Sequence, residues 1–243
     1  MFNQLLTQPI FNALVVLNNL LGDFGFAIIL ITILIRLILY PLFYKSMKNQ
    51  VLITKIQPMI KEIQEKHKDD RQVQTEKIMA LYKEYKINPF SGFLIILIQI
   101  PIFIAIYNVF LAGVTPATLD QNLYSFISRP EIIITNFLSI LNLSERSYAL
   151  TLITAAAQYF LGMVSLPKDT GTKEGAQARN IAKKMMVIGP ILTLLILGTL
   201  PSAVGLYWLT STLFSLVQQV YITRIIYGQD QGLLSESIPT SGV

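Results

Sequence analysis

The sequence has no cysteine, a single histidine and few charged residues. Of its 243 residues, 14% are charged and 53% are hydrophobic, whereas roughly 25% of the residues in an average soluble domain are charged. The absence of cysteine excludes disulfides, thiolate metal sites and thiol catalysis. The histidine, His67, lies in the charged segment KHKDDR, where an exposed side chain is expected rather than a catalytic or metal-binding one.

Motifs that would indicate catalysis are also missing. The chain has no P-loop, no HExxH motif, no Ser-His-Asp candidate and no pair of aspartates within an apolar run. These absences argue against an intramembrane protease and an ATP-driven pump. We therefore predict a protein that is not an enzyme and that needs no cofactor or metal.

The apolar residues are gathered in five long runs. About 20 helical residues cover the roughly 30 Å of a bilayer core, so the runs predict an all-α polytopic membrane protein. The fourth run is short and should thin the bilayer locally or be shielded by the other spans. The predicted spans are residues 24–44, 93–112, 148–166, 185–200 and 204–226.

Residues 1–23 precede the first span and differ from it. Their apolar part is broken by Asn12, Asn18 and Asn19, and leucines recur at helical spacing. There is no basic segment and no small-residue cleavage site, so a cleaved signal peptide is not expected. The pattern predicts an amphipathic helix at the outer interface.

Basic residues in the connecting segments predict the topology. Residues 45–92 carry ten Lys or Arg and residues 167–184 carry five, whereas residues 113–147 carry two. Because basic loops stay in the cytoplasm, the N-terminus is expected outside, with 113–147 as an external loop. The tail, residues 227–243, would be cytoplasmic; it is short and nearly neutral, without a basic arm for ribosomal RNA.

The first cytoplasmic segment, residues 45–92, has two narrow apolar stripes at helical spacing. Asp69 and Asp70 lie between the stripes, and Asn88 and Pro89 end the second one. This pattern predicts a helical hairpin whose stripes pair, the alternative being a solvated spacer. The stripes are Leu52, Ile56, Met59 and Ile63, and Ile78, Leu81, Tyr82 and Tyr85.

Arg36 is the one charged residue in the middle of an apolar run. A central arginine costs about 2.5–3.5 kcal/mol on insertion scales. It would lie about 12 Å along the helix from Tyr44, which is far for snorkelling to the headgroups. We favour a wet cavity open to the cytoplasm, with snorkelling as the alternative.

Polar side chains on other spans could line the same cavity. Thr151, Thr154 and Gln158 share one helical face. Each residue alone could simply form an interhelical hydrogen bond, and Trp208 could belong to an interfacial aromatic belt. The candidate groove residues are Arg36, Thr32, Gln99, Gln158, Tyr207, Trp208, Ser211 and Ser215.

Four stretches together resemble a known family. They are DFGFAIILITILIRLILYPL, KIQPMIKEIQEKHKDDRQ, IMALYKEYKINPFSGFLIILIQIPIFIAIY and LPSAVGLYWLTSTLFSLVQQ. The chain is similar, from about Pro9 to Ile226, to the YidC–Oxa–Alb membrane insertases, and in particular to the bacterial YidC type. It lacks the large periplasmic domain of Gram-negative members, the lipobox cysteine of many Gram-positive ones and a long basic tail.

The resemblance implies an insertase and chaperone of the bacterial inner membrane. Its five transmembrane helices would surround a hydrophilic groove open to the cytoplasm and the lipid, with Arg36 as the groove's positive charge. Gln158 and Trp208 match other groove positions, and the hairpin would receive substrate. The implied partners are nascent membrane proteins, the Sec translocon, the lipid bilayer and, on weaker grounds, the ribosome and signal-recognition targeting machinery, but not DNA.

Two other functions remain compatible with the residues themselves. Arg36 could make a channel or small transporter selective for anions, although no inverted repeat is visible and five spans do not divide into halves. A purely structural assembly factor would leave the groove dry.

Overall fold

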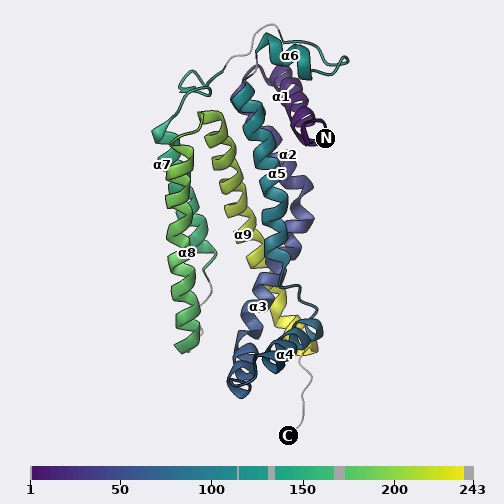
Figure 1. Cartoon of the computed structure of the whole chain (residues 1–243), viewed down its shortest axis with the longest axis vertical. Helices are drawn as coiled ribbons and strands as arrows, with labels where there is room; N and C mark the ends of the chain where they lie inside the picture. The colour runs from purple at the N-terminus through teal and green to yellow at the C-terminus, as the bar shows by residue number, and fades with distance from the viewer. Residues whose placement is uncertain (1, 114, 131–134, 167–172, 238–243) are drawn as a thin grey trace. The chain divides into compact units, whose positions relative to one another are not determined.

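The computed structural model describes residues 2–113, 115–130, 135–166 and 173–237, and this part of the chain is mostly helical (Figure 1). The chain divides into two compact units. The first comprises residues 1–39 and 98–217, and the second comprises residues 40–97 and 218–243. The sequence predicts an all-α fold; the helical character is confirmed, but the described residues also contain one short two-stranded sheet.

The first unit begins with two helices joined by a tight turn. A short π-helix, η1 (Asn3–Thr7), leads into α1 (Gln8–Leu21), which is followed by α2 (Phe24–Ile38). Gly22 ends α1 in the left-handed region at φ 71°, and its N–H donates to Asn18 O. The Asp23 carboxylate then caps α2 by accepting from the N–H groups of Gly25 and Phe26.

The asparagines that interrupt the apolar pattern of α1 attach the helix to a distant segment. Asn12 is buried, donates from Nδ2 to Asn122 O at 2.8 Å, and accepts from Tyr124 N at 2.8 Å. Asn19 donates to Ser128 O at 2.8 Å. Apolar side chains of α1, among them Leu14 and Val15, are buried in the main core. The interfacial position predicted for residues 1–23 stays a prediction.

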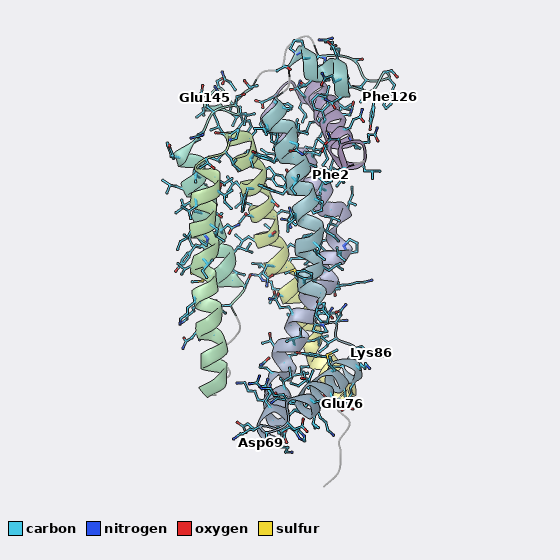
Figure 2. The ribbon with its side chains drawn as sticks, viewed as in Figure 1. Phe2, Asp69, Glu76, Lys86, Phe126 and Glu145 are labelled. Carbon is cyan, nitrogen blue, oxygen red and sulfur yellow. The ribbon has the colours of Figure 1, made fainter. Side chains whose placement is uncertain are left out.

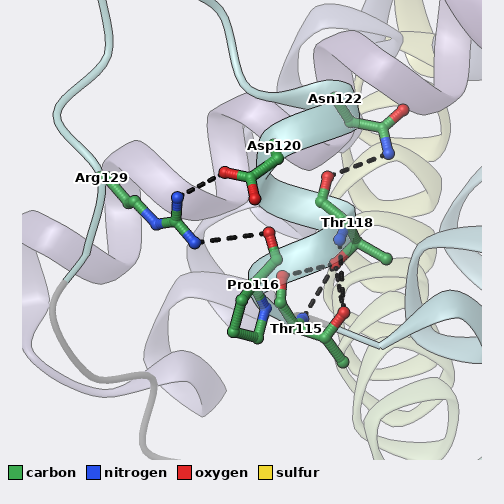
Figure 3. Close-up of polar contacts among 6 residues, drawn as sticks. All are labelled: Thr115, Pro116, Thr118, Asp120, Asn122 and Arg129. Carbon is green, nitrogen blue, oxygen red and sulfur yellow. Dashed lines mark hydrogen bonds and ion pairs between the residues drawn. The ribbon is translucent and has the colours of Figure 1, made fainter.

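The segment between the second and third predicted spans contains regular structure that the sequence analysis described only as a loop. Helix α6 (Pro116–Asn122) begins with a capping box in which Thr115 and Thr118 exchange hydrogen bonds. Arg129 forms an ion pair with Asp120 and donates to Pro116 O (Figure 3). Strands β1 (Asn136–Phe137) and β2 (Leu141–Asn142) pair as an antiparallel hairpin.

The remaining helices of the first unit are apolar for much of their length. They are α5 (Ser91–Ala112), which also extends into the second unit, α7 (Tyr148–Val164), α8 (Lys173–Leu197) and α9 (Ser202–Ser237), which does the same. The main core joins buried residues of α1, α2, α5 and α9, including Phe11, Ile28, Ile106 and Leu206.

Several helices have bounds that differ from the predicted spans. The first span, residues 24–44, is interrupted at Leu39 between α2 and α3 (Tyr40–Lys66); Pro41, which has no N–H to continue the helix ladder, lies next to this break. Helix α8 begins within the predicted loop 167–184, and α9 continues into the predicted tail. Hydropathy predicts which residues could contact lipid. The end of a helix is instead set by where its backbone hydrogen bonds stop, so the two bounds need not coincide.

Membrane-spanning character is clear for only part of the described chain. Helix α5 alone has the length and apolar composition of a span, and α2 with α3 would be a second candidate if the two formed one interrupted span. Helix α7 is apolar but has 17 residues. Large apolar side chains are nevertheless exposed on α2, α7 and α8, for example Leu37, Leu152 and Leu195, as expected of surfaces that face lipid.

The second unit contains two helices over the segment in which a hairpin was predicted. Helix α4 (Arg71–Glu84) is capped by Asp70, and Asp69 lies in the turn between α3 and α4 (Figure 2). After α4, Lys86 adopts the left-handed conformation at φ 52° and Ile87 N donates to Tyr82 O at 2.8 Å. The apolar cluster of this unit contains Ile56, Ile60, Ile87, Leu52, Ile53, Ile78, Leu81, Tyr82 and Tyr85.

Candidate functional site

Arg36 lies on α2 and is buried, with only 8% of its surface exposed. Its Nε donates to Ser211 Oγ on α9 at 2.9 Å, and a second guanidinium nitrogen contacts the same hydroxyl. A buried charge needs hydrogen-bond partners to offset its lost hydration. The Ser211 hydroxyl supplies such a partner from a helix 175 positions away in the sequence.

Two more predicted site residues extend this contact into a chain of hydrogen bonds. Gln99 on α5 donates from Nε2 to the hydroxyl of Tyr207 on α9 at 2.5 Å. Tyr207 also forms a side-chain hydrogen bond with Ser211. Tyr207 and Ser211 are four residues apart, so they share one face of α9. Gln99, Tyr207, Ser211 and Arg36 therefore form a connected network, which we call the Arg36 network.

The other candidates on these helices are satisfied by their own backbone or by packing. Thr32, one turn before Arg36, donates to Ile28 O at 2.6 Å, and Ser215 donates to Ser211 O at 2.9 Å. The ring of Trp208 lies edge-on to Phe103 with centroids 5.5 Å apart. These three residues flank the Arg36 network on α2 and α9.

Gln158 has a different surrounding from the Arg36 network. Its Oε1 lies 3.0 Å from where a Cβ would stand on Gly189 of α8, so its side chain approaches the α8 backbone. Thr193, also on α8, is fully buried and donates to Gly189 O at 3.0 Å. The sequence analysis missed Thr193, whose only signal is a lone hydroxyl in the run GPILTLLIL.

The chemistry of the Arg36 network is that of a fixed positive charge among hydroxyls and an amide. It contains no carboxylate, no thiol and no imidazole. Across the described residues there is also no group of three or more His, Cys, Asp or Glu side chains that could hold a metal ion. The arrangement can attract and orient an anionic group.

A match to a family model shows which family the chain belongs to. Residues 16–229 match the family model described as "60Kd inner membrane protein". The chain belongs to the 60Kd inner membrane protein family. This membership confirms the resemblance predicted from the sequence, and it establishes the class as inner membrane proteins.

Individual relatives within the 60Kd inner membrane protein family agree. The chain is 36% identical over 208 residues to a protein of Francisella philomiragia subsp. philomiragia named "Membrane protein insertase YidC". It is 37% identical over 208 residues to a protein of the same name from Francisella tularensis subsp. novicida. Each alignment covers 86% of this chain and 34% of the relative, so the chain spans about a third of the length of these curated relatives.

A solved structure shows a similar fold. The structure is described as "Active YidC insertase crystal structure with the first transmembrane domain resolved"; it matches with a TM-score of 0.55 and 33% sequence identity. The match covers 83% of this chain and 42% of the solved one. The helical arrangement is therefore shared with part of that protein.

Proposed function

We propose that the chain is a membrane protein insertase and chaperone, not an enzyme, which inserts nascent integral membrane proteins and helps them fold. The single observation that carries this proposal is the buried Arg36 in an apolar helix, bonded to Ser211. A charge in that position is costly. Keeping it in a chain whose relatives are named insertases indicates a role in handling polar segments of other proteins.

The proposed substrate site is a hydrophilic groove open to the cytoplasm and the lipid. The Arg36 network would form its polar wall, with Thr32, Trp208 and Ser215 on the same two helices. Gln158 would contribute from α7. Support comes from four candidates that hydrogen-bond to one another although they come from three separate helices.

The proposed topology has five spans, an external N-terminus and a cytoplasmic C-terminus in a bacterial inner membrane. The spans would be residues 24–44, 93–112, 148–166, 185–200 and 204–226. Support comes from the alternation of basic and non-basic segments along the sequence and from the exposed apolar side chains of α2, α7 and α8.

The proposed mechanism needs no nucleotide. Carrying a polar segment through hydrocarbon is costly, and a wet groove shortens the dry path. Arg36 would attract acidic residues of the client, more strongly in a low local dielectric. The client's apolar span then partitions into lipid, driven by about 25 cal/mol per Å² of apolar surface removed from water.

The proposed partners are nascent membrane proteins, the Sec translocon and the lipid bilayer. The hairpin of α3 and α4 would receive clients and contact the ribosome or the targeting machinery. Support for this role is that the hairpin is folded: Ile56 and Ile60 of α3 and Ile87, which follows α4, are buried in one apolar cluster, against which partly buried side chains of α4 pack. A solvated spacer would not need such a cluster.

Reconstitution tests the proposed function directly. The purified chain is placed in liposomes, a small client is translated in their presence, and protease protection of its translocated segment is measured. Protection above that of empty liposomes is expected. Ion flux without protection would indicate a channel, and neither flux nor protection would leave an assembly factor.

Photo-crosslinking tests the groove. Crosslinkers at Thr32, Gln158 and Ser211 should capture a stalled client more than crosslinkers at Leu194 and Leu195, which are exposed on α8. Equal capture at all five positions would mean random encounter in the lipid and would contradict the groove.

A further inference from the structure

The turn between β1 and β2 has a backbone that does not suit its residues. Ile140 N donates to Phe137 O at 3.0 Å and closes a four-residue turn. Both central residues, Leu138 and Ser139, have positive φ angles, 53° and 59°. Turns of this kind strongly favour Asn and Gly, because other side chains are crowded there. The turn itself therefore does not explain why residue 138 is a leucine, and the explanation must lie in what the side chain contacts.

The turn is held tightly against the beginning of α2. Asp23, the residue that caps α2 through Oδ1, accepts from Leu138 N through Oδ2 at 3.2 Å. Phe137 packs over Gly25 so closely that a Cβ at residue 25 would lie 2.1 Å from Phe137 Cδ2. The Phe137 ring also meets Phe26 edge-on at 5.2 Å. The hairpin is thus fixed to the first turn of α2.

Two of the three exposed side chains at this turn, Leu138 and Ile140, are large and apolar, and Ser139 lies between them. Leu138 is 53% exposed and Ile140 is 88% exposed, the highest value among the large hydrophobic residues described as exposed. The base of the hairpin is polar, since Asn142 donates to the Glu145 carboxylate at 2.8 Å. Residues 135–144 carry no charge. An uncharged apolar tip on a polar base is the pattern of a segment that enters the membrane interface.

The turn packs against the first turn of α2, and this location indicates that the exposed side chains of the turn contact lipid. The first turn of a spanning helix lies where hydrocarbon meets headgroups. Phe26, in that turn, is exposed like Leu34 and Leu37 further along α2, so the apolar tip continues an apolar surface that faces lipid. We propose that the hairpin tip, residues 138–140, inserts into the lipid headgroup layer and sets the depth of α2.

Anchoring the start of α2 would also set the depth of Arg36 in the proposed groove. Arg36 stands about 18 Å along α2 from Phe24, and a depth fixed at the start of the helix fixes the depth of the guanidinium. This inference rests on α2 spanning a bilayer, as in the proposed function, but its test does not depend on insertion activity.

A spin label measures the depth of the tip in the full chain. The native chain has no cysteine, so Ile140→Cys can be labelled alone and reconstituted in liposomes of phosphatidylcholine and phosphatidylglycerol. Ser144→Cys is the matched control, because Ser144 is exposed in the same segment. We expect the label at 140 to collide more with oxygen and less with a water-soluble nickel complex than the label at 144.

Each other outcome overturns the inference. Equal collision with nickel at both positions would place the tip in water. Shielding of position 140 from both oxygen and nickel would indicate a protein partner instead of lipid. An active insertase with a tip in water would contradict only this inference, whereas a lipid-inserted tip on an inactive protein would contradict only the proposed function.

Leu138→Asn separates anchoring from folding. Asparagine tolerates the left-handed backbone but removes the apolar side chain. We expect unchanged or higher thermal stability in detergent, together with increased nickel collision of the label at 140. A label whose collisions do not change would show that Leu138 does not contribute to the anchor and would contradict the proposed tip.

Discussion

Arg36 Nε donates to the hydroxyl of Ser211 at 2.9 Å, joining α2 to α9. Tyr207 and Gln99 continue the contact to α5. The Ser211 hydroxyl therefore fixes the position of the Arg36 guanidinium between α2 and α9.

The first prediction concerns the charge of Arg36. Two unit charges about 4 Å apart attract by about 4 kcal/mol at an effective dielectric constant of about 20, so Arg36→Ala should reduce insertion of a client with an acidic outer segment by about tenfold or more. Arg36→Lys keeps the charge and should retain much of the activity. Protease protection of the translocated segment measures both.

Two controls distinguish the charge from the hydrogen bond. A client whose outer segment has been neutralised should depend less on Arg36. Ser211→Ala removes the acceptor but keeps the charge, so it should reduce insertion less than Arg36→Ala. If Arg36→Ala inserts acidic and neutral clients as well as the parent does, Arg36 has no electrostatic role and only snorkels.

The second prediction concerns topology. Single cysteines at Lys66 and Gln121 can be introduced into the cysteine-free chain; both positions are exposed. An impermeant thiol reagent outside intact cells should label residue 121 and spare residue 66. The opposite labelling would reverse the orientation.

The third prediction concerns Asn12, which ties α1 to residues 122–124. Asn12→Ala removes hydrogen bonds to Asn122 O and from Tyr124 N; Asn122 O keeps the Gln8 side chain as a donor, whereas the part-buried Tyr124 N loses the Asn12 acceptor. A loss of about 1–3 kcal/mol in stability is expected. Asn19→Ala, at an exposed contact, should change stability by about 0.5 kcal/mol or less. Thermal unfolding in detergent compares them, and equal effects would show that the buried contact is not special.

The fourth prediction concerns Lys86 in the second unit. Lys86→Gly relieves a left-handed backbone that costs a non-glycine residue about 1 kcal/mol, so hydrogen exchange at the end of α4 should slow. Lys77→Gly, at an exposed position inside α4, should speed exchange because glycine weakens a helix interior by about 1 kcal/mol. Faster exchange in Lys86→Gly would mean that the lysine side chain itself stabilises this helix end.

The sequence by itself determined the helical class, the family and the presence of one charged residue, Arg36, within an apolar run, because apolar runs and a charge inside one of them are visible in a linear chain. Only the tertiary structure decided which hydroxyl Arg36 meets, that Tyr207 bonds to Gln99, and that Gln158 lies against α8. In the sequence, Asn12 only interrupts an apolar helical pattern. The structure shows that its side chain bonds to residues 122–124. Hydrogen-bond partners more than a hundred residues apart depend on how the helices pack, and a local sequence pattern contains no record of that packing.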